Sequence, residues 1–258
     1  MGILNVTQDS FSDGGLYLET ENAKKKAQLM IEAGASIIDI GGESTRPGAD
    51  PVTINDELKR VIPIIEYVHQ LNVPISIDTH KPEVMEAAVA AGASMINDVC
   101  ALQNKGALEI AAMLDVPICL MHMQGSPQTM QNKPSYNDVV EDIIAFFRER
   151  LSSCSAAGIA QEKLIIDPGF GFGKTLEHNL TILNRLHEFK ILNRPILAGM
   201  SRKSMIGQII NKPADQRVSA SVALATLAWQ SGASFIRVHD VAETKDAFDM
   251  VAAVKSLK

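Results

Sequence analysis

Leu164-Ile165-Ile166-Asp167 is a short apolar run that ends in a carboxylate, and seven further runs in the chain share this form. An apolar strand buried on both faces has no use for Asp, Asn, Arg or His unless its end opens onto a site. The other runs are Ile3-Leu4-Asn5, Ile37-Ile38-Asp39, Ile75-Ser76-Ile77-Asp78, Met95-Ile96-Asn97-Asp98, Ile118-Cys119-Leu120-Met121-His122, Ile196-Leu197-Ala198-Gly199-Met200-Ser201 and Phe235-Ile236-Arg237-Val238-His239-Asp240. Eight such runs, separated by helical stretches, predict an α/β fold, a (β/α)8 or TIM barrel of eight parallel strands whose C-terminal rim carries the chemistry.

The segments between the runs have helical patterns that suit a repeated βα unit. Gly-Ala-Ser recurs at residues 34–36, 92–94 and 232–234, each time between a helical pattern and a strand. Glycine suits the left-handed position that ends a helix, although in an Ala-rich chain the repeat could be a coincidence. The expected helices cover residues 21–33, 55–71, 82–91, 106–114, 137–157, 177–189, 215–230 and 242–257. No linker divides the 258 residues, so we expect a single domain over residues 1–258.

The composition restricts the class of protein. The chain is 46% hydrophobic and has a net charge of −6, which argues against nucleic-acid binding. No apolar run approaches the roughly 18 residues of a membrane helix, and the first run follows no basic signal-peptide region. Cys100, Cys119 and Cys154 lack C-x-x-C spacing and are interpreted as reduced thiols. We therefore expect a cytoplasmic protein with neither a membrane nor a nucleic-acid partner.

Two long loops follow the first two strands and contain residue types suited to ligand binding. The first, residues 5–15, is polar except for Phe11, whose ring could pin the loop or stack on a ligand. The second, residues 41–48, has glycines that let a ligand approach the backbone, and Arg46, which can bind a carboxylate or phosphate. A glycine turn with a surface arginine is the alternative interpretation of the second loop.

The sixth run leads into the glycine-rich segment 167–175, which is not a nucleotide-binding loop. A P-loop needs Gly five residues before Gly173, where this chain has Pro168, and the pattern G-x-G-x-x-G fails at Lys174. Asp167 remains as a rim carboxylate that can accept two N–H bonds from a planar heterocycle. A lone Asp at a strand end is often only a cap. A barrel, however, would bring four such side chains to one rim: Asp39, Asp78, Asn97 and Asp167.

Basic residues follow the seventh and eighth runs, in Ser201-Arg202-Lys203-Ser204 and Arg237-Val238-His239. Barrels commonly bind phosphate with these two loops, so this cluster in an acidic chain predicts an anion site. Side-chain alternation predicts that Arg237 and His239 face the same way. Scattered surface cations are the alternative, and the sequence suggests no role for His122.

Taken in chain order, these motifs resemble those of the dihydropteroate synthase family, whose members bind pterins. Residues 5–15 look like the first signature of that family, and residues 34–47 look like the second. The segments 167–174, 201–203 and 237–239 match its later motifs, so the resemblance spans the chain. Two residues depart from the family pattern: Gln8 replaces the usual Pro, and His80 replaces Ser or a similar residue.

The resemblance implies a folate-biosynthesis transferase that condenses 7,8-dihydropterin pyrophosphate with p-aminobenzoate to give 7,8-dihydropteroate and pyrophosphate. It also implies Mg2+, a homodimer and sensitivity to sulfonamides. The expected catalytic residues are Asp167, Lys203, Arg237 and His239.

The resemblance also assigns binding roles by position. The residues that would bind the pterin are Asp78, Asn97, Asp167 and Lys203. Asn5, with Asp9 or Asp13, would hold Mg2+ on the pyrophosphate, which Arg237, His239 and Thr45 would contact. The p-aminobenzoate site would be lined by Phe11, Arg46, Pro47, Phe172, Lys203 and Ser204.

Three other interpretations stay open at this point. A methyltetrahydrofolate-corrinoid methyltransferase would share Asp78, Asn97 and Asp167 but has no need of the first-loop signature. A barrel aldolase would use Lys203 as a Schiff-base nucleophile. A catalytically silent pterin-binding module would bind the pterin without turnover.

Overall fold

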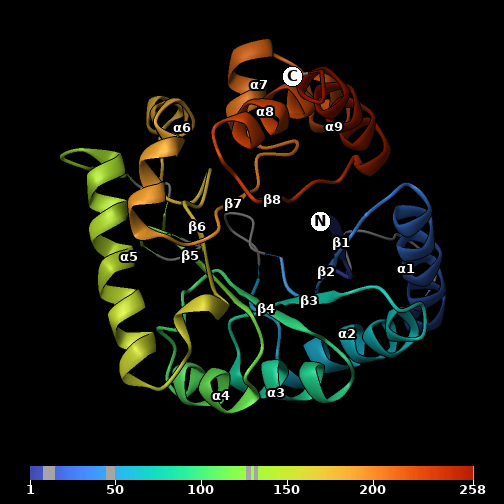
Figure 1. Cartoon of the computed structure of the whole chain (residues 1–258). Coiled ribbons are helices and arrows are strands. Elements are labelled where there is room, and N and C mark those ends of the chain that lie inside the picture. Colours follow the sequence, from blue (N-terminus) through green and yellow to red (C-terminus); the bar gives the residue numbers. More distant parts are fainter. Residues whose placement is uncertain (8–14, 45–49, 126–128, 131–132, 258) are drawn as a thin grey trace.

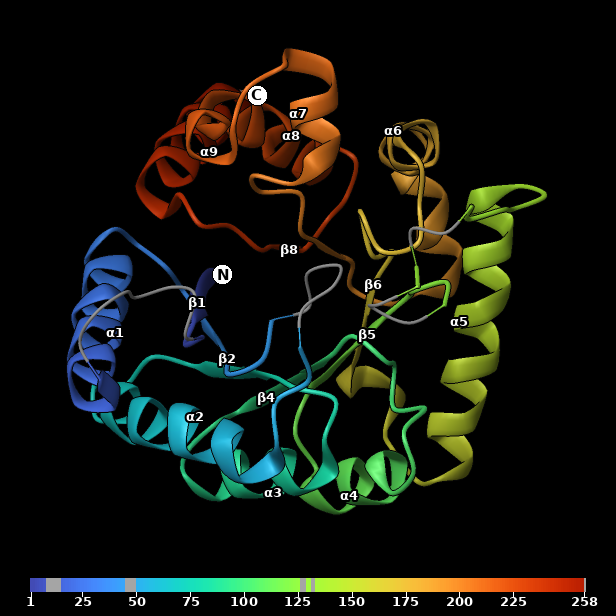
Figure 2. The ribbon, with the colours of Figure 1, turned by 180° about the vertical axis from the view of Figure 1, so that it is seen from behind.

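The structure, a computed structural model, describes residues 1–7, 15–44, 50–125, 129–130 and 133–257. Its strands are β1 (Gly2–Asn5), β2 (Ile38–Gly41), β3 (Ile75–Asp78), β4 (Met95–Asp98), β5 (Ile118–Met121), β6 (Leu164–Asp167), β7 (Leu197–Ala198) and β8 (Phe235–Ile236). Its α-helices are α1 (Gly15–Glu32), α2 (Ile54–His69), α3 (Pro82–Ala90), α4 (Ala107–Leu114), α5 (Val139–Ala156), α6 (Leu176–Asn184), α7 (Ser204–Ile210), α8 (Val218–Gln230) and α9 (Val241–Lys255). Figure 1 shows the helices arranged around the outside of the strands, and Figure 2 shows the same arrangement from behind.

The strands form a closed parallel ring. β1 to β6 make one sheet in chain order, and β7 pairs with β8. Isolated parallel bridges from Gly2 to Val238 and from Ile166 to Ile196 join the two sheets at both edges. The predicted TIM barrel is therefore confirmed. The prediction of a single domain over residues 1–258 stays a prediction.

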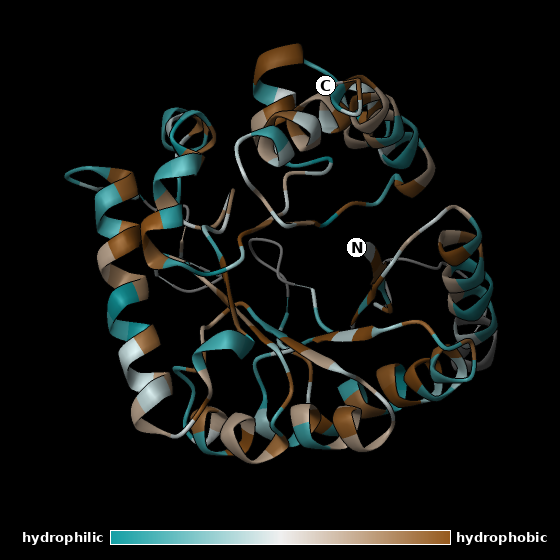
Figure 3. Ribbon diagram, in the orientation of Figure 1, coloured by the Kyte–Doolittle hydropathy of each residue, from teal (hydrophilic) through white to brown (hydrophobic). Residues whose placement is uncertain are grey.

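Alternation along the strands separates two apolar layers. Ile96, Leu120 and Ile166 belong to the main core, which lies between the strands and the helices. Their neighbours Met95, Cys119 and Ile165, with Leu197, form a second cluster inside the ring. Figure 3 shows the strands mostly in hydrophobic colours, with hydrophilic residues concentrated on the helices. The interior is thus packed below the rim, which leaves the strand ends to carry polar groups.

Local signals explain most of the element boundaries. Gly34, Gly92 and Gly232 have φ angles of 94°, 117° and 109°, as expected for glycines that end helices before strands. Pro82 begins α3, where its missing N–H costs no hydrogen bond.

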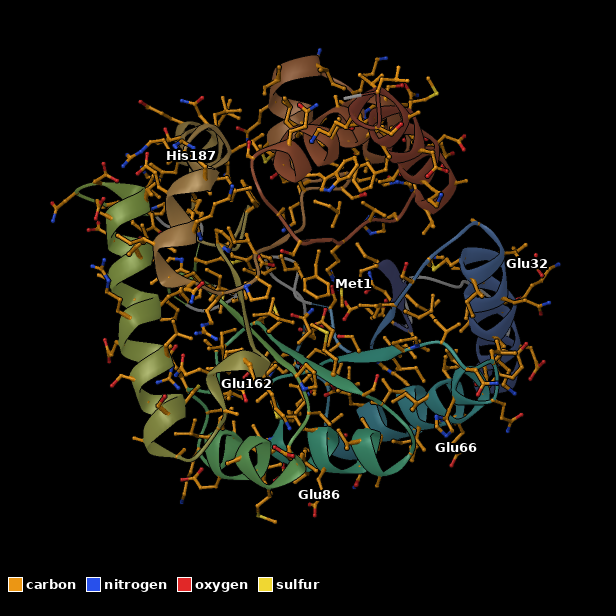
Figure 4. The ribbon with its side chains drawn as sticks, viewed as in Figure 1. Met1, Glu32, Glu66, Glu86, Glu162 and His187 are labelled. Carbon is orange, nitrogen blue, oxygen red and sulfur yellow. The ribbon has the colours of Figure 1, made fainter. Side chains whose placement is uncertain are left out.

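The N-terminus lies at the end of the barrel where the strands begin. The amino group of Met1 donates to the carbonyl of Ile236. Figure 4 shows Met1 within the ring and Glu32, Glu66 and Glu86 at its outer edge.

Several predicted boundaries were wrong. The first helix begins at Gly15 rather than at residue 21, and the expected helix 177–189 divides into α6 and a 3-10 helix, Leu186–Leu192. The eighth helix begins at Val218 because a separate 3-10 turn, Ala214–Gln216, precedes it. No described helix combines the length and the apolar character that crossing a membrane requires.

Candidate functional site

The polar strand ends meet on one rim of the barrel because parallel pairing aligns them. Asn5 lies beside Gly41, Gly41 beside Asp78, and Asp78 beside Asn97 in the strand register. On the far side of the ring, Asp167 lies beside Met121. Side chains from β1, β3, β4 and β6 therefore face a common space at the C-terminal ends of the strands.

Arg237 is the centre of one side of this space. Its Nε donates to Asp39 Oδ2 at 2.6 Å, and its Nη2 donates to Asp78 Oδ2 at 2.7 Å. Asp39 is fully buried, and Asn97 Nδ2 lies 3.4 Å from both of its carboxylate oxygens. Burial raises the pKa of Asp78 to about 7, against the opposing effect of Arg237. Arg237 therefore binds two carboxylates, one of which also contacts the amide of Asn97. The resemblance implied only a contact of Arg237 with pyrophosphate.

Asp167 and Lys203 form the opposite side of the site. Asp167 Oδ1 accepts a hydrogen bond of 2.8 Å from the Gly169 N–H, and among the described residues no backbone N–H donates to Oδ2. Burial raises the pKa of Asp167, and Lys203 opposes that shift. Lys203 donates to the carbonyl of Phe170, and its ammonium lies 4.6 Å from the ring centroid of Phe172. Burial lowers the pKa of Lys203 to about 8.

The predicted anion site, residues 201–204 and 237–239, carries less positive charge than its residue types suggest. Arg202 forms an ion pair with Asp240, with Nε 3.0 Å from Oδ2. His239 Nδ1 lies 2.9 Å from Ser201 Oγ. Burial and then Arg237 lower the pKa of His239 to about 4, so the imidazole is neutral near pH 7. His239 can therefore offer an N–H to a phosphate oxygen but not a positive charge.

The remaining predicted residues are placed as follows. Asn5 Oδ1 lies on the rim, 3.7 Å from where a Cβ on Gly41 would stand, and Ser204 is the exposed first residue of α7. Phe11, Thr45, Arg46 and Pro47 lie outside the described residues. The structure thus brings together Asp78, Asn97, Asp167, Lys203, Arg237 and Phe172.

Comparison with known proteins decides the family. The family described as "Pterin binding enzyme" matches residues 1–239. A dihydropteroate synthase of Escherichia coli is 55% identical over 259 residues, covering 100% of this chain and 92% of that protein. The chain belongs to the dihydropteroate synthase family. It is therefore an enzyme of the transferase class.

Solved structures of the family agree with this assignment. The Yersinia pestis dihydropteroate synthase in a sulfonamide drug complex has a TM-score of 0.95 and 53% identity, covering 99% of this chain and 94% of that one. The Xanthomonas albilineans dihydropteroate synthase with 4-aminobenzoic acid has a TM-score of 0.95 and 50% identity, covering 100% and 93%.

Sequence reasoning gave no role to several residues that the structure joins to the site of this dihydropteroate synthase family member. The sequence predicts Asp39 only as one of four converging polar side chains, yet it receives the Arg237 Nε hydrogen bond. Lys174 lies in a segment that matches the family but has no predicted role, and it contacts His122, 52 residues away. The apolar run before His122 was the available signal, because a buried imidazole at a strand end needs a partner.

His80, one of the two departures from the family pattern, contacts Glu43 at the start of the second loop. Its Nε2 lies 3.1 Å from Glu43 Oε2, and Asn104 Nδ2 lies 2.8 Å from its Nδ1. Lys81 donates to Glu43 at 2.6 Å and also to the buried Glu57. Burial alone would raise the pKa of Glu43, but the hydrogen bonds from His80 and Lys81 lower it to about 2.

Proposed function

We propose that this chain condenses 7,8-dihydropterin pyrophosphate with p-aminobenzoate, giving 7,8-dihydropteroate and pyrophosphate in folate biosynthesis. The cluster of Asp78, Asn97 and Asp167 around Arg237 and Lys203 is the observation that carries the proposal. Membership of the dihydropteroate synthase family supports it.

The buried acceptors suit a flat heterocycle that is rich in N–H groups. Asp167 presents Oδ2 because Oδ1 is already used by Gly169, and Asp78 and Asn97 add acceptors and a donor from neighbouring strands. A pterin lying between these groups satisfies polar atoms that burial would otherwise penalise.

The chemistry is a substitution at the methylene carbon of the pterin substrate. The carbon–oxygen bond to pyrophosphate breaks, and its electron pair leaves with the pyrophosphate. Positive charge on the methylene spreads into the pterin ring, where the carboxylate of Asp167 stabilises the N–H groups. The amine nitrogen of p-aminobenzoate then forms the new carbon–nitrogen bond and loses a proton. An arylamine is neutral near pH 7, so the step needs no strong general base.

The leaving group is received by residues of the seventh and eighth βα loops. His239 is held by Ser201 as a neutral imidazole, and Arg237 is a permanent cation whose guanidinium is oriented by its ion pairs with Asp39 and Asp78. Thr45 completes this side of the site in the proposal.

The residues present fit Mg2+ bound largely through the substrate. Among the described residues, no three or more His, Cys, Asp or Glu side chains gather as a metal cluster. Mg2+ characteristically takes few protein ligands together with phosphate oxygens, and the side-chain oxygen of Asn5 on the rim is a suitable hard donor. When bound, the ion would neutralise charge on the pyrophosphate.

The p-aminobenzoate side consists of Phe172, Lys203 and Ser204, with Phe11, Arg46 and Pro47 contributed by the first two loops. The 4-aminobenzoic acid in the Xanthomonas albilineans structure, at 50% identity, supports this ligand for the chain. Sulfonamides, one of which is present in the Yersinia pestis structure, are the expected competitors.

Release of pyrophosphate, measured with and without p-aminobenzoate, tests the proposal. We expect release that depends on p-aminobenzoate and yields dihydropteroate. Methylation of cob(I)alamin without pyrophosphate release would instead support the methyltransferase. Binding of the pterin substrate without turnover would support the silent module.

We further propose that the enzyme is a homodimer. Large apolar side chains are exposed on the neighbouring helices α7, α8 and α9: Ile209, Leu227, Met250 and Val254. Light scattering of the purified chain gives the mass that tests this proposal.

A further inference from the structure

Lys174 is a buried lysine outside the set of residues assigned to the substrates. Its side chain lies in the loop that joins β6 to α6, and it is only 3% exposed. Its Nζ lies 2.9 Å from His122 Nδ1, 3.2 Å from the His122 carbonyl and 2.9 Å from the Phe172 carbonyl. Lys174 therefore ties the β6–α6 loop to the residue that follows β5.

The two segments approach each other too closely for ordinary side chains. A Cβ on Gly169 would stand 1.9 Å from the His122 carbonyl oxygen, and a Cβ on Gly173 would stand 2.5 Å from the carbonyl oxygen of Gln124. Both glycines have positive φ angles, 71° and 64°. The loop therefore lies backbone against backbone on the segment after β5, and Lys174 supplies a polar connection across that contact.

His122 is itself held in a defined orientation. Its ring makes an edge contact with Phe146 at a centroid distance of 4.9 Å and a tilted contact with Tyr136 at 6.0 Å. The Tyr136 hydroxyl donates to the Gly173 carbonyl at 2.8 Å, so the same aromatic group contacts both segments. Burial lowers the pKa of His122 to about 2, which keeps its imidazole neutral.

The hydrogen bonds of Lys174 do not depend on its protonation state. An ammonium donates to the two carbonyls and to Nδ1 of His122. A neutral amine donates to the two carbonyls and accepts from Nδ1–H. The contacts between Lys174 and His122 therefore form whichever protonation state Lys174 has.

The tied loop carries groups on the p-aminobenzoate side of the site. Lys203 donates to the Phe170 carbonyl, and its ammonium stacks on the ring of Phe172. The carbonyl that Lys174 binds is that of Phe172 itself. In contrast, Asp78, Asn97 and Asp167 extend from the strands β3, β4 and β6 and not from this loop.

We propose that Lys174 and His122 are a positioning pair that holds Phe172 in place for p-aminobenzoate. The inference rests on the proposed function, and it adds two residues outside the sets assigned to the two substrates. Replacing Lys174 with an apolar side chain would leave two buried carbonyls without donors, so the loop must move to reach water.

Steady-state kinetics of Lys174→Met test the pair. We expect the KM for p-aminobenzoate to rise about tenfold, while the KM for dihydropterin pyrophosphate stays within about twofold. The matched control is Ile65→Ala in α2, which empties a fully buried position on another side of the barrel. It should lower Tm and leave both KM values unchanged.

Two substitutions of His122 provide the rescue. His122→Leu removes the Nδ1 partner and should raise the KM for p-aminobenzoate, whereas His122→Gln restores a side-chain acceptor for Lys174 and should largely reverse the rise. If Lys174→Met does not fold, these two variants decide the question. Equal KM values for p-aminobenzoate in the Leu and Gln variants would overturn the pair.

The outcomes separate this inference from the proposed function. An unmodified protein that releases no pyrophosphate on addition of p-aminobenzoate overturns both. An active unmodified protein combined with a Lys174→Met variant that keeps its KM for p-aminobenzoate, or raises both KM values equally, overturns the positioning pair alone.

Discussion

The substitution Asp167→Asn should weaken binding of the pterin substrate without destabilising the fold. In the native side chain, Oδ1 accepts from the Gly169 N–H at 2.8 Å, and Oδ2 is left to face the pterin. Asparagine can keep the Gly169 hydrogen bond only if its oxygen takes the Oδ1 position, which turns its NH2 group toward the N–H groups of the ligand. An acceptor is thereby exchanged for a donor at the point of recognition.

The size of the effect follows from burial. The Asp167 side chain is only 6% exposed, so water cannot replace the lost contact. A hydrogen bond to a charged acceptor contributes about 1.5–3 kcal/mol, and an unpaired buried donor costs about 1–3 kcal/mol. A net loss of about 3 kcal/mol corresponds to a roughly 150-fold weaker dissociation constant.

The same substitution should leave the folded protein at least as stable as the unmodified one. Burial raises the pKa of Asp167, so the charged form disfavours the folded state at every pH above the ordinary value of 3.8. Asparagine removes this penalty and keeps the Gly169 bond, so Tm at pH 7 should be equal or higher. Asp167→Ala, by contrast, also frees the Gly169 N–H and should abolish pterin binding with a lower Tm.

Calorimetric titration of dihydropterin pyrophosphate, without p-aminobenzoate, measures the affinity. Asp167→Asn binding within about threefold of the unmodified protein would refute the assignment of Oδ2 to the pterin. A large fall in Tm at pH 7 would refute the account of its burial.

Three further predictions concern the other parts of the site. Phe11→Ala should mainly raise the KM for p-aminobenzoate; an unchanged KM in steady-state assays would show that the ring only pins its loop. Because the pKa of Lys203 is lowered to about 8, kcat/KM should fall as pH rises through that value, and Lys203→Met should lack this limb of the profile. His80 has a raised pKa because of its hydrogen bond to Glu43, so its stabilising effect is complete below pH 6.5 and is lost as pH rises through the raised value. His80→Ser should therefore lower Tm more at pH 6 than at pH 9, and an equal loss at both would argue against the ion pair.

The barrel could be predicted because each strand carries its own signal. Ile75-Ser76-Ile77-Asp78 is apolar, short and polar at its end, and β3 has those bounds in the structure. The start of the first helix could not be predicted in the same way, because its first residue is Gly15, a poor helix former. The expected helix 177–189 ends early, because Arg185 leaves the helical conformation with φ −105° and ψ 18° and a 3-10 segment follows it.

The partners of the site residues were harder to predict than the residues themselves. Nothing local to Arg237 indicates that Asp39 and Asp78 share its guanidinium, since these contacts depend on barrel closure. The pairing of Lys174 with His122 likewise joins two loops through space. Residue type and strand position predict which side chains reach the rim. Which of these side chains pair with each other can be read only from the folded structure.

The contact between Asp39 and Arg237 spans 198 positions of the chain, which has a consequence for biosynthesis. A ribosome that adds about 5–20 residues per second needs roughly 10–40 s to make that interval. During this time the carboxylates of β2 and β3 have been made, but their counter-charge has not. The nascent barrel cannot bury them until β8 has been made, so closure of the ring and competence for catalysis should appear together, once Arg237 has joined the fold.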